Sequence, residues 1–69
     1  MLTGYTVEVI RRDENGHGVG SKFFHYTNEA EARAEMTTIF KDMFCILTEW
    51  GQFEDGLGNY EIEIDRQNW

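Results

Sequence analysis

Polar and apolar residues alternate through the first third of the chain, and this pattern predicts two β-strands. Residues 3–12 place a tyrosine and two valines at every second position, the period of a half-buried strand. Residues 19–26 form a second such segment, in which Gly20 predicts a bulge. The Asn-Gly pair and further glycines of residues 13–18 favour a turn between them. The two segments therefore predict an antiparallel hairpin.

The spacing of apolar side chains then changes to three and four residues, which predicts one long amphipathic helix. Asn28 is a suitable N-cap, and Glu31 stands at the capping-box position. Gly51 is suited to ending the helix. We expect a helix over residues 29–50, ~33 Å long at 1.5 Å per residue. Its apolar stripe consists of Ala32, Met36, Ile39, Phe40, Met43, Ile46, Leu47 and Trp50.

Residues 59–65 alternate strictly and predict the last strand, after a glycine-containing loop over residues 52–58. A right-handed crossover through the helix places this strand beside the first one and antiparallel to it. We therefore expect a single α+β domain over residues 1–69, with the order β-β-α-β. Its three-stranded antiparallel sheet has the order 2-1-3, and the long helix packs on one face.

This topology assigns each strand residue to one of the two sheet faces. The face toward the helix is predicted to carry Tyr5, Val7, Val9, Tyr60, Ile62 and Ile64. The open face is predicted to carry Thr6, Glu8, Ile10, Glu61, Glu63 and Asp65. With only one helix to cover the sheet, the open face stays in contact with water or with a partner.

The negative charge is concentrated in one segment. The 69 residues carry a formal charge of -7, and residues 42–65 contain seven acids without a Lys or Arg. The other 45 residues hold six acids and six bases. Such a surface repels nucleic acid and attracts basic partners. We therefore expect a basic protein partner, of the kind that processes nucleic acid, and no direct binding of nucleic acid.

The acids of the last strand are the first candidates for that contact. Side chains two apart on a strand are ~6.6 Å from one another on one face, so these carboxylates predict a ridge. The alternative is a solvated strand face whose charges keep the sheet from aggregating. The candidate partner-binding residues are Glu61, Glu63, Asp65, Glu54, Asp55, Glu49 and Glu8.

The residue patterns that carry catalytic or metal chemistry are incomplete. Glu54 and Asp55 lack the ligand spacing of a calcium loop. The glycines of residues 16–20 lie between two strands and not before a helix, where a phosphate-binding loop needs them. His17, His25 and Cys45 lack zinc spacing. We therefore expect a protein that is not an enzyme and that has no catalytic residues, cofactor or metal.

The expected location is the cytoplasm. Cys45 is the only cysteine, so the chain forms no internal disulfide, and residue patterns typical of a signal peptide are absent. No apolar run approaches the ~20 residues that cross a bilayer, so we expect no membrane contact.

A second interpretation of function starts from the Phe23-Phe24 pair. Adjacent strand residues point to opposite faces, so one ring is predicted on the open face, near Ile10. An apolar patch of this kind suits a protein contact. The alternative function is therefore a small structural or assembly module that self-associates through its open sheet face. The expected oligomeric state is a monomer or a weak homodimer.

In size and composition the whole chain resembles small acidic phage-borne inhibitors of bacterial defence, including anti-CRISPR and anti-restriction proteins. The features that carry this resemblance are the short chain, the negative charge and the single cysteine. The resemblance implies a non-enzymatic inhibitor, in some cases a nucleic-acid mimic, that acts in the host cytoplasm. Its carboxylates would pair with Lys and Arg that line a nucleic-acid channel.

Overall fold

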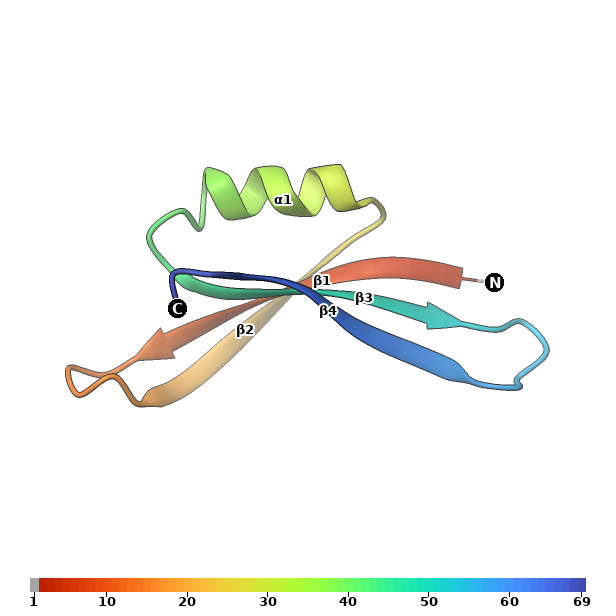
Figure 1. The fold of residues 1–69 in the computed structure, drawn as a ribbon, viewed down its shortest axis with the longest axis horizontal. Coiled ribbons are helices and arrows are strands. Elements are labelled where there is room, and N and C mark those ends of the chain that lie inside the picture. Colours follow the sequence, from red (N-terminus) through yellow and green to blue (C-terminus); the bar gives the residue numbers. More distant parts are fainter. Residues whose placement is uncertain (1) are drawn as a thin grey trace.

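The protein is an α+β fold in which one short helix covers one face of a four-stranded antiparallel sheet (Figure 1). The computed structural model describes residues 2–69. The strand order is β2-β1-β3-β4, and each neighbouring pair is antiparallel. The elements are β1 (Leu2–Arg12), β2 (Gly18–Tyr26), α1 (Glu29–Thr37), β3 (Phe44–Gln52) and β4 (Asn59–Gln67).

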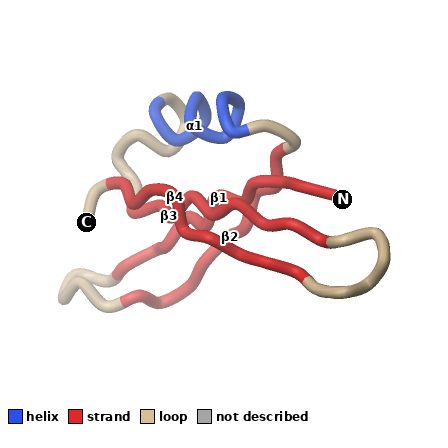
Figure 2. Tube along the Cα trace, turned by 45° about the vertical axis from the view of Figure 1, so that its right-hand side comes forward, coloured by secondary structure: helices blue, strands red, loops and turns tan. Residues whose placement is uncertain are grey.

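The core lies between α1 and the two central strands. Val7 of β1 and Leu47 of β3 are cross-strand partners on the face toward α1, and neither side chain is exposed to solvent. Strand positions two apart share a face, so Val9 and Cys45 pair on the same side. The buried cluster consists of Val7, Ala32, Met36, Phe40, Cys45 and Leu47. Figure 2 shows that α1 lies on this side only, which leaves the opposite, open face of the sheet uncovered.

The predicted long helix over residues 29–50 is wrong, because α1 ends at Thr37. Its start is as predicted: the Asn28 side chain accepts a hydrogen bond from the Glu31 amide at 2.7 Å. Threonines then occupy positions 37 and 38, and β-branched residues are weak helix formers. The Thr38 hydroxyl donates to the Ala34 carbonyl at 2.6 Å, a contact that competes with the helix ladder.

The second half of the predicted helix is strand β3. Its aromatic and β-branched residues favour a strand, and it alternates Cys45 and Leu47 toward α1 with Phe44 and Ile46 toward the open face. Both faces of β3 thus carry apolar residues. Its sequence therefore shows no alternation of polar and apolar positions, and its apolar residues also fit the spacing of a helical stripe. The three-stranded sheet of order 2-1-3 is therefore also wrong. Strand β3 takes the predicted place beside β1, and the last strand pairs with β3 at the edge.

Two glycines let large rings cover the central strands. A Cβ atom built on Gly4 would lie 2.2 Å from Cζ2 of Trp50, its cross-strand partner. A Cβ atom on Gly51 would lie 2.2 Å from a ring carbon of Tyr60 in the same way. Each glycine therefore allows an aromatic ring to pack flat against the backbone of the opposing strand.

The Gly4→Ala variant should be destabilised by about 1–3 kcal/mol, because the new methyl group forces the Trp50 indole out of its place. Urea unfolding followed by circular dichroism measures this loss. Gly20→Ala is the matched control, since a Cβ atom there has no neighbour within 4 Å. Equal stability of the two variants would contradict the packing of Trp50 on Gly4.

Candidate partner-binding surface

A β-bulge in β4 divides the predicted carboxylate ridge between the two faces of the sheet. Glu61 and Glu63 lie opposite Trp50 and Thr48 on the open face. The register then shifts between Leu47 and Thr48, so that Asp65 lies opposite Leu47, on the side of α1. The expectation that Glu61, Glu63 and Asp65 share one face is therefore wrong for Asp65.

Asp65 and Glu63 are also bound by arginines, one from α1 and one from β4 itself. Nη1 of Arg33 on α1 lies 2.9 Å from a carboxylate oxygen of Asp65, and Nε of the same side chain lies 3.0 Å from Glu29. Arg66 donates through Nε and Nη2 to both oxygens of Glu63, the second at 2.9 Å. This bidentate hydrogen bond lowers the pKa of Glu63. The folded chain thus neutralises two of the three ridge carboxylates.

The remaining candidates occupy three different surroundings. Glu49 lies on the α1 side and accepts a 3.0 Å hydrogen bond from the Tyr5 hydroxyl, which raises the pKa of Tyr5. Glu8 is half-buried on the open face, between Phe23 and Ile46. Glu54 and Asp55 are exposed in the β3–β4 loop.

The β3–β4 loop has a defined turn that presents these two acids. The Phe53 amide donates to the Gly58 carbonyl at 3.0 Å, and the Leu57 amide donates to the Asp55 side chain at 3.0 Å. Gly56 has a φ of 75°, a left-handed conformation that glycine adopts without strain. Phe53 and Leu57 are 42% and 85% exposed, so the loop combines negative charge with apolar surface.

The fold gathers acids at one end of its long axis, which measures 46 Å. Gly4 pairs with Trp50, Trp50 pairs with Glu61, and β2 returns to this end just before α1 begins. The start of β1, the β3–β4 loop and the start of α1 therefore lie on the same half of the molecule, on the right of Figure 1. We call this the acidic end: residues 2–7, 25–32 and 49–62, with six acids and no Lys or Arg. Its acids are Glu29, Glu31, Glu49, Glu54, Asp55 and Glu61.

Glu29 and Glu31 are the members of this end that the sequence did not indicate as site residues. Both stand in the first turn of α1, where acids are common, and Glu31 is indicated only as the capping-box residue. The nearness of Glu29 to the other acids is long-range: Glu49 and Glu29 both contribute to the raised pKa of Tyr5. The pattern of one chain segment carries no signal for such a contact.

An aromatic and cationic cluster lies on the open face at the other end of the sheet, and it too was missed. The Arg12 guanidinium stacks 4.2 Å from the Phe44 ring centre and 4.3 Å from that of Trp69. Arg66 lies 5.2 Å from the Trp69 ring. These contacts fix the C-terminal residues on β3, where the Trp69 indole donates to the Cys45 carbonyl at 3.3 Å.

The histidines and the cysteine do not assemble into one site. Cys45 is buried under α1, and burial raises the pKa of its thiol. His25 lies on the open face, 2.9 Å from the Thr6 hydroxyl, while His17 is in the β1–β2 loop. Within residues 2–69, no three His, Cys, Asp or Glu side chains are grouped to hold a metal ion. In the same described part of the chain, no helix is long and apolar enough to cross a membrane.

Comparison with protein-family models, curated proteins and solved structures finds no match for this chain.

The Arg66→Gln variant should raise the pKa of Glu63 toward that of an ordinary glutamate, because the hydrogen bonds that favour the charged carboxylate are lost. In the native chain the pair stabilises the fold above the unfolded pKa, and this contribution disappears as pH falls through the lowered folded pKa. A carboxyl-carbon NMR titration measures the pKa of Glu63 in the native chain and in the variant. Lys41→Gln is the control, and an unchanged Glu63 titration in Arg66→Gln would contradict the pairing.

Proposed function

We propose that this protein is a non-enzymatic binding protein whose acidic end contacts a basic protein partner. The observation that carries the proposal is the segregation of charge: the acidic end holds six of the thirteen acids and none of the six bases, and one of these acids, Glu29, is paired with Arg33 beside it. A one-signed surface of this kind speeds the approach of an oppositely charged partner and selects against like-charged ones.

The shape of this end favours contact through a protruding tip. The β3–β4 loop projects beyond the sheet (Figure 1). It carries the exposed Asp55 between the exposed side chains of Phe53 and Leu57 in the sequence. In protein interfaces, apolar side chains typically form the centre and charged side chains form the rim. Glu61, on the open face of the adjoining edge strand, extends the negative surface from this tip.

The proposed partner is a protein that processes nucleic acid, because such proteins line their channels with Lys and Arg. The proposed action is inhibition by competition with nucleic acid, in the manner of anti-CRISPR and anti-restriction proteins. A tip that enters a basic channel fits the acidic end better than a regular phosphate-like ridge, since Glu63 and Asp65 are already paired with Arg66 and Arg33. The encounter is proposed to occur in the cytoplasm, where a lone thiol such as Cys45 stays reduced.

Reversing the charge of the acidic end should abolish capture of the partner. The variant Glu54→Lys/Asp55→Lys/Glu61→Lys is immobilised and exposed to lysate of the native host, then washed at about 50 mM and about 500 mM salt. The native chain is expected to retain a nucleic-acid-binding protein at low salt only, and the variant is expected to lose it.

A second triple variant, Glu14→Lys/Glu35→Lys/Asp42→Lys, makes the same change in net charge away from the acidic end. It should retain the partner, because the proposal depends on the location of the charge. Loss of the partner in both variants, or in neither, would contradict the proposal. Circular dichroism confirms that both variants are folded before the capture is compared.

The open face favours a second candidate function, assembly with another copy of the chain. Phe23 and Trp69 are 59% and 52% exposed, and Phe23 stands on the face that α1 leaves uncovered. Burial of these rings would drive a salt-insensitive homodimer. Sedimentation at high salt separates the two functions: a dimer that Phe23→Ser dissociates supports assembly, and a monomer at all concentrations supports a foreign basic partner.

A further inference from the structure

A groove lies at the end of the molecule opposite the acidic end, where the sheet extends beyond the end of α1. Because α1 ends at Thr37, the end of β1 and the start of β2 are left partly uncovered. The resulting groove has a volume of about 800 Å³, within the range of small-molecule sites. It is independent of the acidic end and of the function proposed for it.

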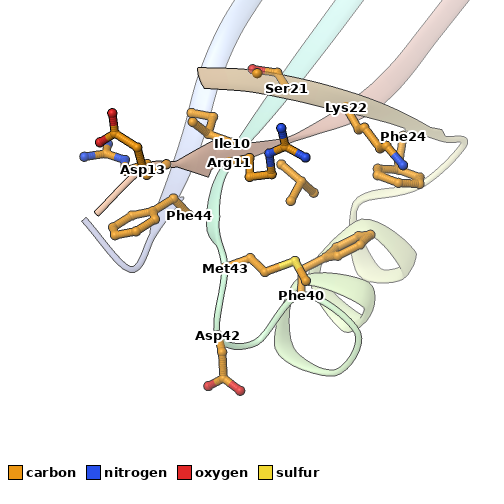
Figure 3. A pocket seen from close by; sticks show the side chains of 13 residues that line it. Ile10, Arg11, Asp13, Ser21, Lys22, Phe24, Phe40, Asp42, Met43 and Phe44 are labelled. Carbon is orange, nitrogen blue, oxygen red and sulfur yellow. The ribbon is translucent and has the colours of Figure 1, made fainter. Parts of the chain in front are cut away.

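The floor and one wall of the groove are apolar. Phe24 of β2 and Phe40 of the turn pack with their ring centres 4.9 Å apart, and Met43 extends beside Phe40 (Figure 3). Phe24 and Met43 remain 36% and 45% exposed. Methionine and aromatic side chains adapt well to an irregular apolar guest. This part of the groove offers a place for a hydrocarbon or aromatic body.

Two cations stand together at the sheet side of the groove. Val9 pairs with Lys22 and Arg11 pairs with Gly20, so Arg11 and Lys22 are diagonal neighbours on one face, a spacing of about 7–8 Å. Neither forms an ion pair with another side chain among residues 2–69, whereas Arg33 and Arg66 do. A single anionic group between them would receive hydrogen bonds from both.

The carboxylates that border the groove do not compete for these cations. Asp13 accepts from the amides of Asn15 and His17 at 3.0 and 2.9 Å, in the β1–β2 loop. Asp42 points away from the groove (Figure 3). The charge that faces the apolar wall is therefore positive, although the chain as a whole is negative.

We infer that this groove is a binding site for a small anionic amphiphile, a molecule with one carboxylate-like head and one apolar body. The head lies between Arg11 and Lys22, and the apolar body lies against Phe24, Phe40 and Met43. The occupant is a small molecule because the apolar wall is short and the two cations border the same groove.

Titration with decanoate, followed by amide NMR shifts, tests the assignment. Decanoate should shift the amides of Lys22, Phe24 and Met43, whereas decyltrimethylammonium, with the same chain and a positive head, should not. Arg11→Gln/Lys22→Gln should weaken decanoate binding about tenfold or more. Met43→Gln should weaken it as well, through the apolar wall, and Lys41→Gln, a cation outside the groove, should leave it unchanged.

Two results would overturn the inference. Equal binding of the cationic and anionic probes would show that Arg11 and Lys22 contribute nothing to recognition. Binding of a peptide with the sequence of residues 53–57, without binding of decanoate, would instead assign the groove to the acidic loop of a second copy. The amide spectra also report whether each variant is folded, so a loss of binding is separated from a loss of structure.

Discussion

The pairing of β1 with β3 is the interaction on which the rest of the structure depends. Val7 and Leu47 face each other at its centre, fully buried beneath Ala32 and Met36 of α1. A domain this short buries only about 60% of its surface, so few contacts remain to replace this pair. Once β3 occupies the place beside β1, β2 and β4 become the two edges, and each hairpin loop projects from an opposite end of the sheet.

In this arrangement, the uneven distribution of charge along the sequence becomes an uneven distribution of charge along the long axis of the molecule. The β3–β4 loop, the start of α1 and the start of β1 lie on the same half of the molecule, and these segments contain no Lys or Arg. Arg11 and Lys22 lie toward the other end, beside the groove. Arg33 and Arg66 lie between and neutralise Asp65 and Glu63. One chain thus presents negative charge at one end and, at the other, a groove bordered by Arg11 and Lys22.

The sequence pattern predicted correctly those features that depend on residues close together in the chain. The β1–β2 hairpin, the Asn28 cap and the division of Phe23 and Phe24 between the two faces are confirmed, because each depends on neighbouring residues. Strand β3 was missed because apolar residues on both its faces also fit a helical stripe. The bulge that turns Asp65 toward α1 has no sequence signature, and the Arg33 contact joins residues that are 32 positions apart. Long-range pairing therefore reduced the predicted ridge and created the acidic end in its place.

Paramagnetic relaxation with charged cosolutes tests the central claim, the location of the negative charge, most directly. A cationic and an anionic nitroxide of the same size are added in turn, and the relaxation of each amide proton is compared. We expect the cationic probe to be strongly enriched at the acidic end, residues 2–7, 25–32 and 49–62, and the anionic probe to be favoured around Arg11 and Lys22. An even ratio of the two probes along the chain would contradict the account.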